Sequence, residues 1–261
     1  MIKAKKSLGQ NFLIDNNVIE KIINYIDVKN KTVLEIGPGT GNLTNFILKK
    51  NPKEVFAIEK DNNLANKLIN KFENKVKVIN QDILTIDETS LFTNKAIVFG
   101  NLPYNISTEI ICKWISNLRK DYWFECLILM FQKEVADRII ADSNSSKYGR
   151  LTILCKWKLD IKKICDVKPI SFIPRPKVDS TLLYFNPKKN FYKIKDPINL
   201  EKLTRTFFNN RRKMLKKPYN KLFNGDLSVS DKLNINLNLR PQNLNIETYY
   251  KLTQEYEKLI S

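Results

Sequence analysis

The sequence predicts an α/β fold built on a mainly parallel β-sheet, and three observations carry that prediction. Short apolar runs alternate with segments whose apolar residues recur at helical spacing. The first of the strand-like runs leads directly into a glycine turn, within residues 33–44. Later runs end at acidic or amide side chains, as expected where parallel strands present polar groups at one edge of a sheet.

The first half of the chain supplies most of these elements in order. An opening helix is expected to bury a face formed by Val18, Ile19, Ile22, Ile23 and Ile26. Buried strands are expected at residues 33–36, 55–58, 76–79, 96–99 and 122–131. The helix after the second strand has an apolar face of Leu64, Leu68, Ile69 and Phe72. Ser107 is expected to cap a helix whose apolar face is Ile110, Ile111, Trp114, Ile115 and Leu118.

The second half predicts two more strands and a smaller, basic domain. The strands are expected near residues 159–167 and 181–185, after a polar loop at 142–149. Residues 188–197 are polar and interrupted, so we divide the chain into domains at 1–187 and 188–261.

A basic segment lies near the start of the second domain. Residues 201–221 hold eight basic residues and one acidic residue. Five polar residues recur at steps of three and four and predict one stripe on a helix: Lys202, Arg205, Asn209, Arg212 and Lys216. The packed side of that helix is expected to carry Leu200, Leu203 and Phe207. A charge run is usually a solvated helix face, but this imbalance favours phosphate binding.

Composition limits the class of protein. The chain has 261 residues and a formal net charge of +18, which favours a polyanionic partner, with nucleic acid as the first candidate. A composition rich in Lys, Asn and Ile, typical of an AT-rich genome, explains many lysines but not the clusters of arginine. No apolar run is long enough to span a membrane, and the N-terminus has no apolar signal core, so we expect a cytoplasmic protein without a membrane partner.

Cysteine and histidine usage excludes several chemistries. Four cysteines are scattered without a Cys-x-x-Cys pair, which indicates small core residues in a reducing compartment. The chain has no histidine, which removes His-based triads, most catalytic zinc sites and imidazole general bases. We therefore expect no metal.

The glycine turn indicates the ligand class. Gly37, Gly39 and Gly41 follow the first strand, but a dinucleotide fingerprint would place a third glycine at position 42, where the chain has Asn42. No Lys-Ser/Thr pair follows, which argues against a phosphate-cradling loop. A ligand with an adenosine and no phosphate remains, and S-adenosylmethionine fits. Such turns also occur for purely structural reasons, so the prediction depends on the ends of the next strands.

Two of those strand ends carry carboxylates. Glu59 follows the second strand, where it can accept both hydroxyls of a ribose, although it could also be a surface residue. Asp82 follows the third strand and is placed to accept from an adenine amino group; an ordinary turn Asp is the alternative. Together with the glycine turn and Asn101, they predict a cofactor site at one sheet edge.

The fourth strand runs into Asn101-Leu102-Pro103-Tyr104, the most specific local signal. An adenine N6 amine is a poor nucleophile and needs two acceptors that hold its protons and direct its lone pair. The side-chain oxygen of Asn101 can be one acceptor. The carbonyl of Leu102 can be the other, because Pro103 restricts Leu102 to an extended geometry. Tyr104 offers a flat face to the base, and a plain strand-ending proline turn would not need these neighbours.

Residues 172–180 form a rigid, basic, proline-containing segment. Phe172 is predicted to cover the second face of a base stacked on Tyr104. A core phenylalanine beside a proline loop is the alternative.

These motifs resemble a known family. The segments 10–13, 35–41, 101–104, 172–180 and 208–213 occur in the order found in the rRNA adenine N6-dimethyltransferases, and the likeness covers essentially the whole chain. It is greatest for the KsgA type, which acts on small-subunit ribosomal RNA. The Erm-type enzymes of the large subunit share the N-terminal motifs, but the Phe-Asn-Asn-Arg-Arg-Lys run and the length beyond it favour the small-subunit type. A non-catalytic assembly factor on the same fold would be expected to lack Asn101 or the glycine turn.

The resemblance implies a Rossmann-like class I methyltransferase sheet with a small all-helical C-terminal domain. It implies S-adenosylmethionine as cofactor, and the site residues it carries over for that cofactor are Asn11, Leu13, Gly37, Glu59, Asp82 and Asn101. It further implies dimethylation of two adjacent adenosines near the 3′ end of small-subunit RNA during assembly. RNA contacts are predicted in the C-terminal segment, at Arg205, Arg211, Arg212, Lys213 and Lys216. We expect a monomer.

Overall fold

The computed structural model describes residues 4–5, 8–118 and 122–260, and the chain divides into two compact units. The first unit comprises the residues up to 114 together with 118–136 and 161–187. The second comprises 115–117, 137–160 and the residues from 188 onward. Residues 137–160 therefore group with the C-terminal segment, although the sequence placed them in the first domain. The division of function at residue 187 stays a prediction.

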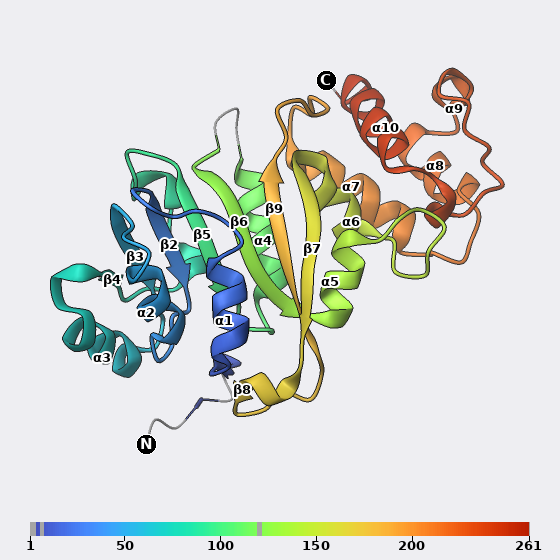
Figure 1. The fold of residues 1–261 in the computed structure, drawn as a ribbon. Coiled ribbons are helices and arrows are strands. Elements are labelled where there is room, and N and C mark those ends of the chain that lie inside the picture. Colours follow the sequence, from blue (N-terminus) through green and yellow to red (C-terminus); the bar gives the residue numbers. More distant parts are fainter. Residues whose placement is uncertain (1–3, 6–7, 119–121, 261) are drawn as a thin grey trace. The chain divides into compact units, whose positions relative to one another are not determined.

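A seven-stranded sheet forms the centre of the first unit (Figure 1). Its strands lie in the order β4-β3-β2-β5-β6-β9-β7. Their bounds are Thr32–Ile36 for β2, Glu54–Ile58 for β3, Lys77–Ile79 for β4, Ala96–Asn101 for β5, Phe124–Gln132 for β6, Leu159–Val167 for β7 and Ser180–Pro187 for β9. The ladders from β4 to β6 are parallel, whereas β9 runs antiparallel to β6. The predicted α/β class is confirmed.

Helices cover both faces of this sheet (Figure 1). These helices are α1 (Asn16–Ile23), α2 (Asn42–Leu48), α3 (Asn62–Phe72) and α4 (Ser107–Asn117), whereas α5 (Lys133–Ile140) includes residues of both units. Side chains from α1, α2 and α3 share one core cluster with alternate residues of the strands, including Val33, Ile97 and Phe99. Helix α4 lies on the opposite face, with Ile110, Ile111 and Trp114 buried. The sheet is therefore buried on both sides, which explains its near-continuous apolar strands.

A second, two-stranded ladder joins the N-terminal segment to the proline-containing segment. Strand β1 (Phe12–Leu13) pairs antiparallel with β8 (Phe172–Ile173), after the short turn η5 (Pro169–Ser171). Asp15 caps α1 and also accepts a hydrogen bond from Ser171 Oγ at 2.8 Å. These contacts join segments more than 150 residues apart, and strands of two residues leave no periodic pattern in a sequence.

The second unit is helical. Its helices beyond α5 are α6 (Arg150–Lys158), α7 (Pro197–Phe208), α8 (Lys216–Phe223), α9 (Ser228–Lys232) and α10 (Ile246–Leu259), with a short turn η6 (Pro241–Asn243). Leu200, Leu203 and Phe207 are buried on α7, as predicted. Within the described residues no helix is long and apolar enough to cross a membrane.

The prediction of one basic helix stripe from Lys202 to Lys216 is wrong. Helix α7 ends at Phe208, and α8 starts only at Lys216. Between them the backbone turns towards residues 237–239, because Leu215 N donates to Leu239 O at 2.8 Å and Lys216 N donates to Leu237 O at 3.0 Å. Tertiary hydrogen bonds therefore override the helical spacing of the charges.

The prediction that Ser107 caps α4 is also corrected. Ser107 is the first residue of that helix, and Ile106 occupies the cap position without a side-chain hydrogen bond. The helices α5 and α6 were not predicted from the sequence.

Candidate active site

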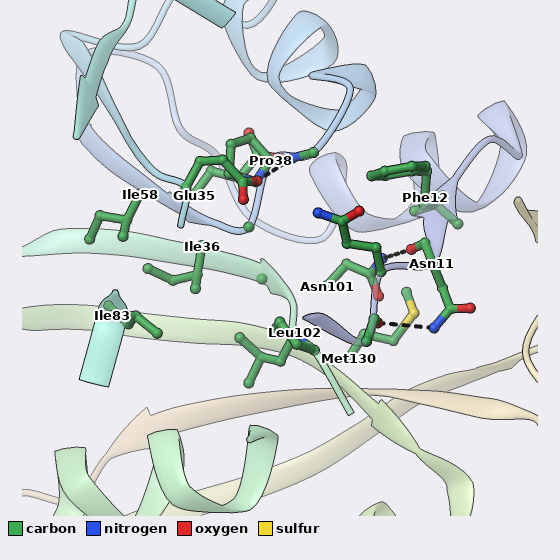
Figure 2. A pocket seen from close by; sticks show the side chains of 18 of the residues that line it. Asn11, Phe12, Glu35, Ile36, Pro38, Ile58, Ile83, Asn101, Leu102 and Met130 are labelled. Carbon is green, nitrogen blue, oxygen red and sulfur yellow. Dashed lines mark hydrogen bonds between the residues drawn. The ribbon is translucent and has the colours of Figure 1, made fainter. Parts of the chain in front are cut away.

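A pocket lies at the carboxyl ends of the parallel strands, entirely within the first unit (Figure 2). Strands β2, β3 and β5 end in its wall, at Ile36, Ile58 and Asn101. Many of the predicted site residues line it, namely Asn11, Leu13, Gly37, Gly39, Glu59, Asp82, Asn101, Leu102, Pro103 and Tyr104. Gly41 and Phe172 are not among the lining residues.

The glycine turn brings bare backbone to the pocket. Gly37 and Gly39 have φ values of +64° and +58°, which residues with a Cβ rarely adopt. A Cβ on Gly39 would also come within 2.7 Å of the Phe12 ring. Gly41 serves the fold instead, because it starts α2 at φ +75° and a Cβ there would lie 2.6 Å from Phe72.

Glu59 fastens this turn to the end of β3. Its Oε2 accepts from Gly39 N at 3.1 Å, and its Oε1 accepts from Asp61 N at 2.9 Å. The residue is only 7% exposed, and burial raises the pKa of Glu59 above its ordinary value against the lowering effect of these hydrogen bonds. A carboxylate offers about four lone-pair sites, so these hydrogen bonds leave Glu59 with acceptor capacity for a ligand hydroxyl.

Asp82 also lies in the wall of the pocket. Its Oδ2 pairs with Lys60 Nζ at 2.6 Å, and its Oδ1 accepts from Leu84 N at 3.0 Å. The Lys60 ammonium holds the pKa of Asp82 below its ordinary value, so the carboxylate stays an acceptor. The partner Lys60 also lines the pocket, and no motif in the sequence singled it out.

Asn101 is oriented by the N-terminal segment. Its Nδ2 donates to the carbonyl oxygen of Asn11 at 2.7 Å, which leaves Oδ1 as an acceptor (Figure 2). Within the described part of the chain, no hydrogen bond reaches Asn101 Oδ1 or the carbonyl of Leu102. Two adjacent acceptors without donors therefore stand at the end of β5.

Tyr104 is fixed through its hydroxyl. The Tyr104 oxygen lies 2.5 Å from Ser180 Oγ, and Ser180 is fully buried at the start of β9. Burial raises the pKa of Tyr104 above its ordinary value, so the phenol stays neutral. Ser180 was not singled out in the sequence, although it ends the proline-containing segment.

Phe172 does not lie where the stacking prediction needs it. The side chain is 0% exposed and belongs to the core cluster together with Leu13 and Met130. Its strand β8 pairs with β1, which turns the ring into the sheet core. This arrangement corresponds to the core alternative, and covering a base would require the segment to move.

The N-terminal segment is tied down on the site by side chains that sequence patterns do not reveal. Asp61 Oδ2 accepts from Gln10 Nε2 at 3.2 Å and pairs with Lys5 Nζ at 2.9 Å. Asn42 Nδ2 donates to Leu13 O at 2.8 Å. The residue that interrupts the dinucleotide fingerprint thus holds Leu13 against the turn.

Glu35 is a further buried carboxyl in the pocket wall. It is 3% exposed and accepts from Thr44 Oγ1 at 2.6 Å. Burial raises the pKa of Glu35 to about 7. In the sequence, Glu35 stood out only as part of a motif.

The predicted RNA contacts lie in the second unit. Arg205, Arg212, Lys213 and Lys216 are exposed, and we call these four the C-terminal basic cluster. Arg211 differs, because its Nε donates to Gln242 Oε1 at 2.8 Å and its terminal nitrogen donates to Ser145 O at 2.9 Å. Arg211 therefore has a structural role that joins the 142–149 loop to η6.

Residues 1–258 of the 261-residue chain match the protein family described as ribosomal RNA adenine dimethylase. A protein of Pelagibacter ubique (strain HTCC1062) named "Ribosomal RNA small subunit methyltransferase A" is 61% identical over 258 residues, covering 99% of this chain and 98% of the relative. The chain belongs to the ribosomal RNA adenine dimethylase family. It is a methyltransferase, and its cofactor is S-adenosylmethionine.

Solved structures agree on the fold of this dimethylase. A dimethyladenosine transferase from Plasmodium falciparum superposes with a TM-score of 0.80 at 30% identity, covering 95% of this chain and 98% of that one. The 23S rRNA methyltransferase ErmE superposes with a TM-score of 0.69 at 22% identity, covering 95% and 100%. The second likeness concerns the fold alone.

The pocket of this dimethylase fits its cofactor. Gly37 and Gly39 present bare backbone to the pocket at positive φ, a conformation that residues with a side chain rarely adopt. Glu59 has lone pairs left for hydroxyls, and Ile58 and Ile83 supply apolar walls for a flat base. Among the described residues, no group of three or more metal-ligating side chains is placed to hold a metal ion.

We predict that Glu59→Ala weakens binding of S-adenosylhomocysteine by roughly 1.5–3 kcal/mol, because charge-assisted hydrogen bonds to the ribose are removed. Isothermal titration calorimetry measures the affinity. Glu20→Ala removes an exposed carboxylate from α1 and serves as the matched control. Unchanged affinity in Glu59→Ala would exclude Glu59 from the cofactor site.

A second prediction concerns Glu35, whose pKa is raised from the ordinary 4.5 to about 7. Between these values the folded protein keeps a proton that the unfolded chain releases, so this residue's contribution to stability falls as pH rises. Glu35→Gln does not titrate, so its free energy of unfolding relative to wild type should rise by up to about 3 kcal/mol from about pH 4.5 to about pH 7.5. Urea unfolding at both pH values measures the difference, and a pH-independent difference contradicts the prediction.

Proposed function

We propose that this dimethylase transfers methyl groups to the N6 atoms of two adjacent adenosines near the 3′ end of small-subunit ribosomal RNA, yielding N6,N6-dimethyladenosines. The two acceptors without donors at Asn101 and Leu102 are the observation that carries the proposal. The names of the relatives from Pelagibacter and from Wolbachia, the latter 41% identical over 266 residues, support the small subunit as substrate. We further propose that the substrate is the immature small subunit. The enzyme is proposed to be cytoplasmic and to act as a monomer.

At the cofactor end, each residue has a proposed role that its geometry supports. Glu59 binds the ribose hydroxyls through its remaining lone pairs, and Asp82 accepts from the adenine amino group of the cofactor. The turn at Gly37 and Gly39, together with Asn11 and Leu13, would contact the remaining part of the bound cofactor. When bound, S-adenosylmethionine supplies an electrophilic methyl group.

At the target end, the pair of acceptors captures the N6 amine. In the first transfer Asn101 Oδ1 and Leu102 O each accept one N6 proton, and in the second transfer one of them accepts the single proton that remains, so the nitrogen lone pair points towards the methyl donor. Bound S-adenosylmethionine would supply the methyl group to this lone pair, and the surplus N6 proton, held at Asn101 Oδ1 or Leu102 O, would then leave to water. Tyr104, fixed by Ser180, offers its ring to the adenine, which must leave its stack to enter the pocket. Positioning, and not proton abstraction, carries the chemistry.

The C-terminal segment supplies RNA affinity in this proposal. Residues 188–261 carry 16 basic and 7 acidic residues, a net charge of +9. None of the predicted cofactor contacts lies in this segment. The C-terminal basic cluster is therefore proposed to bind phosphates of structured RNA and to take no part in methyl transfer.

The direct test is to map the modification. The purified enzyme is incubated with immature small subunits or large subunits and S-adenosylmethionine that carries a labelled methyl group. Mass spectrometry of nuclease fragments should locate two adjacent N6,N6-dimethyladenosines near the 3′ end of the small-subunit RNA. Labelled adenosine in large-subunit RNA alone would instead support the Erm-type activity, and no labelled adenosine in either would support a non-catalytic role.

We predict that Asn101→Ala folds and binds RNA with wild-type affinity but transfers methyl groups at least about 100-fold more slowly, because one of the two N6 acceptors is removed. Single-turnover kinetics at saturating S-adenosylmethionine measure the transfer step. Asn63→Ala, on α3 and outside the pocket, is a matched control that should keep the wild-type rate. A fully active Asn101→Ala enzyme would refute the acceptor mechanism.

The RNA-binding prediction uses a variant in which the four residues of the C-terminal basic cluster become Gln. RNA affinity should fall, and the slope of its salt dependence should flatten by about one unit for each phosphate that the variant no longer neutralises. The affinity for S-adenosylhomocysteine should stay unchanged. Arg211 is left intact because of its structural hydrogen bonds. Filter binding at several salt concentrations measures the RNA affinity and its slope.

The control variant carries the same charge change on exposed lysines of the first unit, at Lys29, Lys50, Lys53 and Lys67. It should retain more RNA affinity than the cluster variant. If the affinity of the two variants falls equally, only net charge matters, and if the cluster variant matches wild type, the cluster is a solvated face.

A further inference from the structure

The chain between β4 and β5 carries one wall of the cofactor pocket but has little regular structure. Residues 80–95 contain only two short turns, η3 (Ile83–Thr85) and η4 (Glu88–Ser90). Their backbone hydrogen bonds are local, such as Thr85 N to Asp82 O at 2.9 Å and Leu91 N to Glu88 O at 3.2 Å. Asp82 and Ile83 nevertheless line the pocket. Side chains from other elements must therefore hold this segment in place.

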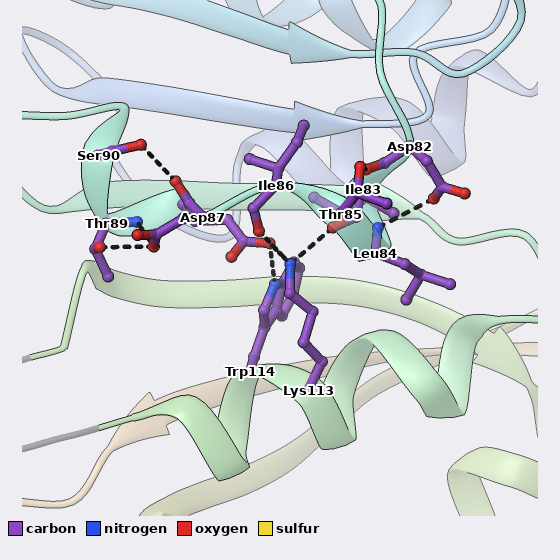
Figure 3. A network of polar contacts seen from close by, with 11 residues as sticks. Asp82, Ile83, Leu84, Thr85, Ile86, Asp87, Thr89, Ser90, Lys113 and Trp114 are labelled. Carbon is purple, nitrogen blue, oxygen red and sulfur yellow. Dashed lines mark hydrogen bonds and ion pairs between the residues drawn. The ribbon is translucent and has the colours of Figure 1, made fainter.

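Lys113 of α4 reaches into that segment (Figure 3). Its Nζ donates to Ile83 O at 2.8 Å, to Ile86 O at 2.5 Å and to Glu88 Oε1 at 2.8 Å. An ammonium has three protons, so all of its donors are used. One side chain thus holds the carbonyls on both sides of Leu84 and Thr85, together with the carboxylate that follows them.

Glu88 completes the arrangement. The same Oε1 atom accepts from Trp114 Nε1 at 2.7 Å, and Trp114 is 1% exposed on the buried face of α4. The side chains of Lys113 and Glu88 are 17% and 5% exposed. These hydrogen bonds fix the position of the segment on α4. Removal of one partner from a buried ion pair is strongly destabilising.

The position of Lys113 has a consequence for the pocket. Lys113 does not line the pocket, but the residue whose carbonyl it holds, Ile83, does. Asp82, the neighbour of Ile83, caps η3 through Leu84 N, so a shift of η3 would move its carboxylate. The Lys113 charge also contributes to the lowered pKa of Asp82, after the larger effect of Lys60.

We propose that Lys113, paired with Glu88, is a positioning residue for the adenine end of the cofactor pocket. It acts through Ile83 and Asp82, whose spacing decides how well the base of the cofactor is recognised. The proposal rests on the proposed binding of S-adenosylmethionine in this pocket with its adenine at Asp82 and Ile83, and it is independent of which RNA is methylated.

Lys113→Met keeps the length of the apolar stem and removes the ammonium. Its dissociation constant for S-adenosylhomocysteine should rise about 10-fold, a loss about as large as one charge-assisted hydrogen bond to the cofactor, because Asp82 would no longer be held in place for the adenine amino group. In kinetics, KM for S-adenosylmethionine should rise while kcat at saturation stays within about twofold. Lys67→Met removes an exposed lysine of α3 and is the matched control, with both constants unchanged.

A readout on the base separates positioning from general stability. The probe is the inosine counterpart of S-adenosylhomocysteine, in which an oxo group replaces the adenine amino group. Wild-type enzyme should prefer the adenine compound, and Lys113→Met should lose most of that preference. A loss of thermal stability with unchanged affinity and unchanged preference would overturn the proposal.

Glu88→Gln keeps the experiment decisive if Lys113→Met does not fold. The amide can still accept from Trp114 but no longer neutralises Lys113. We expect a smaller change of the same kind, with roughly a two- to fivefold fall in affinity and a reduced preference for adenine. A folded Glu88→Gln enzyme with wild-type affinity and preference would overturn the proposal in that case. RNA methylation is not needed for any of these measurements, so failure here is distinct from failure of the proposed function.

Discussion

The hydrogen bond from Asn101 Nδ2 to the carbonyl of Asn11 is the contact on which the proposed acceptor mechanism depends. It joins the end of β5 to a segment 90 residues earlier, at 2.7 Å. Because an amide has one donor end and one acceptor end, this bond obliges Asn101 Oδ1 to remain an acceptor. The N-terminal segment holds Asn11 in turn, through Gln10 and Lys5 on Asp61 and through Asn42 on Leu13. A methyltransferase without histidine can then hold an amine by acceptors alone.

Much of the sheet and of the cofactor wall could be predicted, because both follow from local patterns. Apolar runs such as 96–99 have the composition of buried strands, and the carboxyl ends of parallel strands share one edge. Glu59, Asp82 and Asn101 therefore meet in the pocket, as their positions after strands indicated. Gly37 and Gly39 of the glycine turn also line the pocket. Gly41 does not line it, and lies instead where α2 packs on α3.

The features that could not be predicted depend on contacts between distant residues. The β1–β8 ladder pairs two-residue strands, and it places Phe172 in the core, whereas the proline segment alone left both a base-stacking ring and a core phenylalanine open. Arg211 was predicted as an RNA contact because a charge pattern does not show that its guanidinium donates to Gln242 and Ser145. The break between α7 and α8 arises from hydrogen bonds to residues 237–239, which spacing cannot reveal. No sequence motif singled out Lys113 or Glu88, so their pairing could not be predicted.

The measurement that tests the central claim most directly is the methyl-transfer rate of Asn101→Asp. Aspartate keeps the size and one carbonyl-like acceptor of asparagine but cannot donate to Asn11 O, and its negative charge would face that carbonyl. If the donated bond sets the geometry, single-turnover transfer at saturating S-adenosylmethionine should fall at least about 100-fold while RNA affinity is retained. A rate within about threefold of wild type would show that the orientation of the Asn101 amide by Asn11 is not what makes the site competent.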